Sequence, residues 1–96
     1  MESNDLDLFF MLCAKLSTRR ELHDFFDLLL TEDEKQQISS RIVILQDLLE
    51  GDLSQREIAK TQNVSISQIT RGSNALKKAS PKVKKFLEEN LTSWRR

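Results

Sequence analysis

The chain has 96 residues, 39% of them hydrophobic and 31% charged, with 15 Lys or Arg balanced by 15 Asp or Glu. This length suits one domain, so we expect a single domain over residues 1–96. Two glycines and one proline leave little turn material for a β-fold, and no apolar run approaches the roughly 20 residues of a membrane span, so the composition favours a soluble all-α protein. The acidic N-terminus is unlike a secretory signal, and the lone Cys13 suits a reducing cytoplasm.

The balanced net charge conceals two halves of opposite sign. Residues 1–50 hold five Lys or Arg against eleven Asp or Glu, whereas residues 51–96 hold ten against four. Eight cations lie between Arg56 and Lys85, and Glu57 is the one anion in that stretch. This distribution indicates a basic face for a polyanion and an acidic face directed away from it, although a solvated helix face also explains a basic run.

The first predicted helix is apolar on more than one side. Ser3 or Asn4 caps it, and it runs to about Ser17. Its main apolar stripe has helical spacing and consists of Phe9, Leu12, Cys13 and Leu16. Because a helix that is apolar on several sides must be covered on several sides, we expect a second subunit to cover part of it.

Two further helices complete the acidic half of the chain. Thr18 and Glu21 form a capping box that begins a short second helix. Thr31 caps a long third helix, and three acidic residues complement its positive N-terminus. This helix ends before Gly51, a residue type common just after a helix.

Two more capping boxes lie close together in the basic half. Ser54 with Glu57 begins a helix near Gln55, and Ser65 with Gln68 begins another near Ile66. The turn between these two helices is only a few residues long, as a helix-turn-helix requires. A last helix follows Ser80-Pro81 and carries Trp94 as a packing residue near its end, which makes six helices in all.

The helix that begins near Ile66 sorts its side chains into two faces. One face combines small, hydrogen-bonding and cationic groups, namely Ile66, Ser67, Thr70, Asn74 and Lys77. The opposite face consists of Ile69, Gly72, Ser73 and Leu76. A helix that enters the DNA major groove needs this division, although an ordinary amphipathic surface helix has it as well.

Arg71 and Gly72 add a second signal in the same helix. A glycine inside a helix costs about 1 kcal/mol relative to alanine, so Gly72 needs an explanation. One explanation is the close packing of a neighbouring helix. The other is a planar or bulky group that approaches the backbone beside an arginine able to stack on it.

The segments LSQREI and SQITRGSNALK, at residues 53–58 and 67–77, resemble the tryptophan repressor family. The resemblance extends from Leu28 to Leu91. It implies a six-helix intertwined homodimer in which residues 1–51 and 80–96 form the dimer core and residues 54–79 form a helix-turn-helix unit. It also implies a cytoplasmic repressor of tryptophan biosynthesis or transport genes, which binds a palindromic operator in double-stranded DNA with L-tryptophan as corepressor.

The resemblance also implies a ligand site. It places the indole ring between the guanidinium groups of Arg41 and Arg71, with room left by Gly72. Thr31 and Arg71 would hold the ligand carboxylate. The backbone carbonyls of Leu28 and Leu30, contributed by the partner subunit, would accept from the ammonium group.

One position departs from the family pattern at this ligand site. A serine that helps to hold the polar end of the ligand is Ala75 in this chain. The loss of one hydrogen bond to a charged group is worth roughly 1.5–3 kcal/mol, so we expect weaker tryptophan binding and not its abolition.

For DNA, the resemblance places Ile66, Ser67 and Thr70 against base edges. The backbone and nearby edges would be contacted by Arg56, Gln68, Asn74 and Lys77. Two departures bear on these contacts. A lysine usual on the first helix of the pair is Ala59 here, and a small residue usual in the turn is Asn63.

The sequence gives no sign of enzyme chemistry. His23 is the single histidine and has no ligand cluster around it, so we expect neither a catalytic centre nor a metal site. Two alternatives to the tryptophan-responsive repressor stay open. One is a repressor-like DNA-binding regulator that needs no tryptophan or uses another ligand, which Ala75 favours. The other is a small helical adaptor whose basic face binds an acidic protein.

Overall fold

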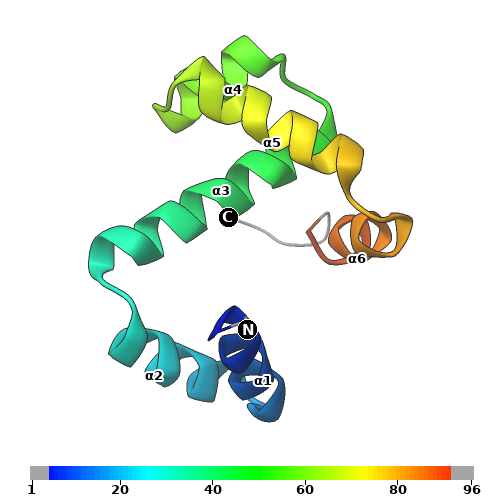
Figure 1. Ribbon diagram of the computed structural model, residues 1–96. Helices are drawn as coiled ribbons and strands as arrows, with labels where there is room; N and C mark the ends of the chain where they lie inside the picture. The colour runs from blue at the N-terminus through cyan, green and yellow to red at the C-terminus, as the bar shows by residue number, and fades with distance from the viewer. Residues whose placement is uncertain (1–4, 92–96) are drawn as a thin grey trace. The chain divides into compact units, whose positions relative to one another are not determined.

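The computed structural model describes residues 5–91 (Figure 1). Six helices and no strand occur in that range, which confirms the predicted all-α class. The helices are α1 (Asp5–Lys15), α2 (Arg19–Leu29), α3 (Glu32–Glu50), α4 (Gln55–Gln62), α5 (Ile66–Lys78) and α6 (Pro81–Leu91). The predicted cap at Ser3 or Asn4 and the predicted packing of Trp94 fall outside the described residues.

Most of the predicted helix starts are formed by the predicted side chains. The capping boxes Thr18–Glu21 and Ser54–Glu57 are complete, with each pair exchanging two hydrogen bonds. At α6, Ser80 Oγ accepts from the Val83 backbone N–H at 3.2 Å, with proline in the first helical position. These caps satisfy N–H groups that have no partner within their own helix.

Two helix starts differ from the prediction in detail. Thr31 caps α3 through a full capping box with Glu34, with hydrogen bonds of 3.1 and 2.9 Å, where only a simple cap and a charge effect were predicted. At α5, Ser65 Oγ accepts from the Gln68 backbone N–H at 3.3 Å, but within residues 5–91 the Gln68 side chain does not return the bond. The Gln68 carboxamide is therefore left for another partner.

Left-handed backbone ends two of the helices. Gly51 follows α3 with φ +73°, as predicted for a residue just after a helix. Asn63 ends α4 with φ 57° and ψ 49°, and it donates its backbone N–H to the last turn of that helix. Asparagine tolerates this conformation better than other non-glycine residues, which explains why it can stand in the turn between α4 and α5.

The described residues fall into two compact units, divided between Lys35 and Gln36. In the N-terminal unit, aromatic rings join α1 to α2. The Phe9 ring stacks on Phe25 with centroids 6.2 Å apart and lies 5.9 Å from Phe26. Lys35 Nζ donates to Asp27 Oδ1 at 2.6 Å, which ties the start of α3 to α2 and lowers the pKa of the Asp27 carboxyl.

No side chain among residues 5–35 is fully buried. Large apolar side chains of α1 and α2 are instead exposed, with relative exposures from 37% to 86%: Leu6, Leu8, Phe10, Met11, Leu12, Leu22, Leu28 and Leu29. A single copy of the unit therefore keeps apolar area in water that further packing would remove.

The C-terminal unit contains the rest of α3 together with α4, α5 and α6. Its core is small and consists of Ile44 from α3, Ile58 from α4 and Ile69 from α5, with relative exposures of 3%, 0% and 0%. Helices α4 and α5 pack against each other, and α5 also lies against α3 (Figure 1). The core thus fixes α5 on α3 from its inner side.

Two buried polar side chains of α3 hold the neighbouring helices. Gln62 Nε2 at the end of α4 donates to Asp47 Oδ2 at 2.9 Å, and Gln46 Nε2 donates to the Leu91 carbonyl at the end of α6 at 2.9 Å. Gln46 and Asp47 are 3% and 4% exposed. Because a buried polar group is costly unless it is hydrogen-bonded, these contacts favour one placement of α4 and α6 on α3.

Candidate functional site

Helix α5 presents two faces, as its sequence predicts. Ile69 is fully buried, and Gly72, Ser73 and Leu76 are partly buried beside it. The residues predicted to read DNA, Ile66, Ser67, Gln68, Thr70, Asn74 and Lys77, are all exposed. The inner face therefore anchors α5, and the outer face is accessible to a ligand or a macromolecule.

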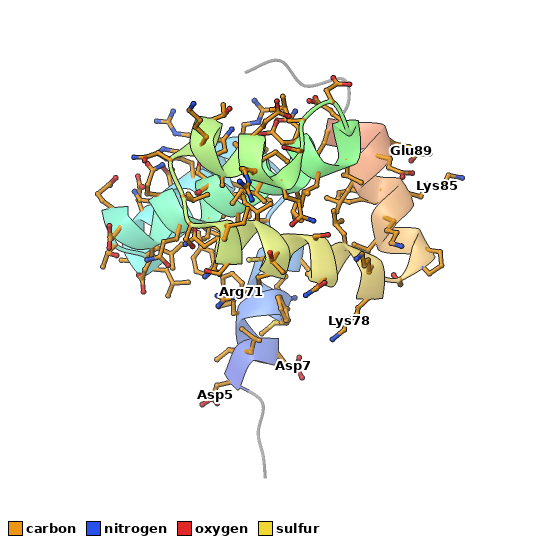
Figure 2. The ribbon with its side chains drawn as sticks, turned by 90° about the horizontal axis from the view of Figure 1, so that it is seen from above. Asp5, Asp7, Arg71, Lys78, Lys85 and Glu89 are labelled. Carbon is orange, nitrogen blue, oxygen red and sulfur yellow. The ribbon has the colours of Figure 1, made fainter. Side chains whose placement is uncertain are left out.

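A wide depression of about 530 Å³ runs along the outer face of α5. It is lined by Ser67, Thr70, Arg71, Asn74, Ala75 and Lys78. Arg71 and Lys78 project from the same side of the helix (Figure 2). Lys77 lies elsewhere, around a hollow with Leu48, Leu49, Ser73, Leu76, Lys84 and Glu88. The structure thus includes Lys78 in the exposed stripe of α5 that lines the outer depression, although Lys78 was not among the residues predicted to contact DNA.

Two hydroxyl groups of this stripe already have partners. Ser67 Oγ lies 2.9 Å from Ser65 Oγ, and Thr70 Oγ1 donates to the Ile66 carbonyl at 3.1 Å. A base edge that used either hydroxyl would have to share or replace these bonds. The Asn74 carboxamide, in contrast, makes no hydrogen bond within residues 5–91 and is ready for a new partner.

A second hollow, of about 310 Å³, lies between α3 and α5. Arg41, Ile44 and Leu45 line it from α3. Gln68, Arg71, Gly72 and Ala75 line it from α5. The volume is at the small end of the ~300–1,000 Å³ typical of ligand pockets. The combination of two arginines with apolar lining residues suits a small anion that carries an aromatic ring. A guanidinium group can pair with a carboxylate and can also stack on a ring.

Arg71 belongs to both depressions. Its side chain lies between the outer face of α5 and the hollow against α3. Arg41 lines only the hollow, and Lys78 lines only the outer depression. Among residues 5–91, Arg71 and Ala75 line both depressions, and Arg71 is the charged residue of the two, which the spacing of residues along the sequence could not show.

Gly72 packs closely against α3. A Cβ atom built on Gly72 would lie 3.2 Å from Ile44 Cγ2 and 3.4 Å from Leu48 Cδ1. Close packing of a neighbouring helix therefore explains this glycine, and the same residue also lines the hollow. The approach of a ligand to its backbone stays a prediction.

We expect Gly72→Leu to destabilise the protein by about 1–3 kcal/mol, because the new side chain would overpack the contact between α5 and α3. Urea unfolding followed by circular dichroism measures this. Thr70→Leu, an exposed position on the same helix, is the control and should change the stability by less than ~0.5 kcal/mol. Unchanged stability of Gly72→Leu would contradict the packing explanation.

The three remaining predicted ligand residues lie in the N-terminal unit. Leu28 is 86% exposed, and Leu30 is partly buried and donates its backbone N–H to the Phe26 carbonyl at 2.9 Å. Thr31 is exposed, and its hydroxyl accepts from the Glu34 backbone N–H at 3.1 Å. Their roles toward a ligand stay predictions.

The structure shows the contacts of the alanines at which this chain departs from the family pattern. Ala59 on α4 is partly buried against the isoleucine core, so a small side chain fits there. Arg56, one turn earlier on α4, is exposed. Ala75 lines both depressions with a methyl group that cannot hydrogen-bond.

The family of this chain follows from comparison with known proteins. The family model described as Trp repressor protein matches residues 4–91. This chain belongs to the Trp repressor family. The predicted recognition is therefore confirmed, and the matched range holds both hollows and every predicted site residue.

Named relatives within the Trp repressor family are similar over most of their length. The Trp operon repressor homolog of Chlamydia caviae is 54% identical over 80 residues, which are 83% of this chain and 79% of the relative. The homolog of Chlamydia trachomatis serovar L2 is 46% identical over 90 residues, or 94% and 96% of the two chains. The homolog of Vibrio vulnificus is 42% identical over 79 residues, or 81% and 78%. The chain is thus a tryptophan-repressor-like regulator.

No group of three or more His, Cys, Asp or Glu within residues 5–91 is arranged to hold a metal ion. Over the same range, none of the helices has both the length and the apolar character to cross a membrane. The Trp repressor family is a family of regulators, and the hollows described above are its candidate sites in this chain.

Proposed function

We propose that this protein represses genes of tryptophan biosynthesis or transport in the cytoplasm, by binding a palindromic DNA operator as a homodimer with L-tryptophan as corepressor. The position of Arg71 in both depressions carries the proposal, because a ligand in the inner hollow would contact a residue of the outer face. Family membership and the names of the relatives support tryptophan as the ligand.

In this proposal, residues 54–79 form the helix-turn-helix unit of one domain, with α5 in the major groove. The exposed stripe of α5, its basic C-terminal end and the positive charge of residues 51–96 support a polyanionic partner. Ile66, Ser67 and Thr70 would meet base edges. The phosphates and nearby edges would be met by Arg56, Gln68, Asn74 and Lys77.

The apolar area left exposed supports a dimer whose core is residues 1–51 and 80–96. Within residues 5–91 only three apolar side chains are buried, all of them isoleucines. Large apolar side chains of α1, α2 and α6 remain in water, including Phe86 at 61% exposure. A second copy that covered them would supply the hydrophobic burial that a chain of this length lacks alone.

The ligand would act through the placement of α5 on α3. The ring would lie between Arg41 and Arg71 beside Gly72, and the carboxylate would pair with Arg71 and Thr31. The ammonium would be held by the carbonyls of Leu28 and Leu30 of the partner subunit. A filled hollow would fix the separation of the two α5 helices, and a dimer engages two half-sites about 34–36 Å apart only when that separation is right.

A gel-shift titration with the full chain tests the proposal. L-tryptophan should tighten binding to a palindromic operator, and binding should weaken as the salt concentration rises. The affinity of the protein for a matched duplex with one scrambled half-site should fall with salt concentration but should not change with L-tryptophan. A helical adaptor for an acidic protein would show no preference for the palindrome.

Ala75 favours a second candidate function, a DNA-binding regulator of the same type that is independent of tryptophan or uses another ligand. Its methyl group offers no hydrogen bond to the polar end of an amino acid. Equal operator affinity with and without L-tryptophan, in a protein that still prefers the palindrome, would favour this candidate. In that case Ala75→Ser should not change the effect of L-tryptophan on operator affinity. In a tryptophan-dependent repressor, the same substitution should increase that effect.

We expect Lys78→Gln to weaken DNA binding evenly across sequences, because Lys78 extends the outer stripe of α5. One phosphate contact per subunit would make the slope of log K against log salt less steep by ~1.8 for a dimer. Lys15→Gln removes an exposed charge from α1 and is the control. An equal slope in Lys78→Gln and wild type would contradict the phosphate contact.

A further inference from the structure

We propose that the Gln68 carboxamide recognises the ring N–H of the aromatic ligand, and that Gln68 is therefore a ligand-specificity residue. This inference rests on the proposed function, because it takes the hollow between α3 and α5 as the tryptophan site. The resemblance assigned Gln68 to DNA alone. The structure places it on the wall of the hollow with Arg41 and Arg71.

The side chains that line the hollow differ in their capacity to accept a hydrogen bond. An indole N–H is a donor and needs an acceptor. Arg41 and Arg71 carry donors only, and Ile44, Leu45, Gly72 and Ala75 have no hydrogen-bonding side chain. Gln68 Oε1 is thus the single side-chain acceptor that lines the hollow among residues 5–91. Backbone carbonyls within the helices are already engaged in the helical hydrogen bonds.

The Gln68 side chain has no hydrogen-bond partner among the described residues. It does not complete a capping box with Ser65, and it makes no hydrogen bond within residues 5–91. Both the carbonyl and the amino group of its carboxamide are therefore available. A ligand contact would cost no existing bond, which distinguishes Gln68 from the hydroxyls of Ser67 and Thr70.

The charge of Arg71 favours the ring N–H over the ligand ammonium as the partner of Gln68. Gln68 precedes Arg71 by three residues, so the two side chains leave α5 on the same face, about one helical turn apart. An ammonium group at Gln68 would be repelled by the guanidinium of Arg71, whereas a neutral N–H would not. The ring edge is therefore the part of the ligand that fits beside Gln68.

The test is calorimetric titration of the full-length protein without DNA, so that any DNA contact of Gln68 has no influence. The ligands are L-tryptophan and 3-(benzothiophen-3-yl)-L-alanine, in which a sulfur atom replaces the ring N–H at similar size. Wild type should bind the sulfur analogue about three- to tenfold more weakly, as expected for the loss of one neutral hydrogen bond. Gln68→Leu should bind both ligands equally.

Gln55→Leu removes an exposed glutamine outside the hollow and should keep the wild-type preference. Thermal unfolding by circular dichroism checks that Gln68→Leu is folded, as its exposed position predicts. An equal preference for tryptophan in wild type and in Gln68→Leu would overturn the inference. So would equal binding of both ligands by wild type.

A third ligand, indole-3-propionate, lacks the ammonium group but keeps the ring N–H. One outcome is that Gln68→Leu binds indole-3-propionate and L-tryptophan equally but still binds L-tryptophan more tightly than the sulfur analogue. In that case Gln68 binds the ammonium group, and the inference is wrong. If wild type binds none of the three ligands, the proposed function itself fails. The two failures are therefore distinguishable.

Discussion

Replacing Arg71 by alanine should weaken L-tryptophan binding by about ten- to a hundredfold and remove the operator response with it. The reason is the place of Arg71 in both the inner hollow and the outer depression of α5. The loss of a hydrogen bond to a charged group is worth roughly 1.5–3 kcal/mol, which corresponds to the expected loss of affinity. Calorimetry measures tryptophan binding, and a gel-shift titration measures operator binding.

Two variants separate the roles of Arg71. Arg41→Ala removes an arginine that lines only the hollow, and it should weaken tryptophan binding while leaving the salt dependence of DNA binding unchanged. Lys78→Gln should do the reverse. Unchanged tryptophan binding in Arg71→Ala would show that the ligand occupies another place. Because Arg71 is exposed, its replacement should leave the melting temperature nearly unchanged.

Ile58→Ala should destabilise the protein by about 2–5 kcal/mol, the range for removal of a large buried aliphatic side chain. Ile58 is fully buried, and within the described range its core contains two other buried apolar residues, Ile44 and Ile69. The loss would loosen α4 from α3 and α5. Urea unfolding at one fixed protein concentration measures the effect, since the stability of a dimer depends on concentration.

Ile66→Ala is the matched control for the stability measurement. It removes the same atoms from a side chain that is 50% exposed at the first position of α5. Its effect on the free energy of unfolding should be within about 0.5–1 kcal/mol. Similar losses in both variants would mean that Ile58 is not the centre of the core.

Short-range interactions at the helix ends made the positions of most helices predictable from the sequence. Sequence patterns correctly placed the hydroxyl caps at Thr18, Ser54 and Ser80. They also placed Gly51 correctly, directly after α3. Such signals depend on side chains and backbone groups within three or four residues of each other. The first helix ends at Lys15, two residues before the predicted end near Ser17, since the next capping box at Thr18 requires extended backbone.

The site was predictable only in part. The family resemblance led to Arg41 and Arg71, and the structure brings both to one hollow. The hydrogen bond between partly buried Gln62 and buried Asp47 was not predicted, because a polar residue in a helix is expected to be exposed unless its distant partner is known. Lys78 also lines the outer depression, four residues after Asn74 and seven after Arg71 on the same helix face, although it was not among the residues predicted to contact DNA.

By itself, the sequence determined the all-α class, the capped starts of the helices, the division of charge and the family, because each depends on residue types at short spacing. The tertiary structure alone decided which side chains share a hollow. Gln68, Arg71 and Ala75 meet Arg41 and Ile44 across two helices, although 24 or more residues of chain separate the groups. The packing of α5 on α3 at Gly72 creates that meeting, and no short-range pattern encodes the distance between two helix faces.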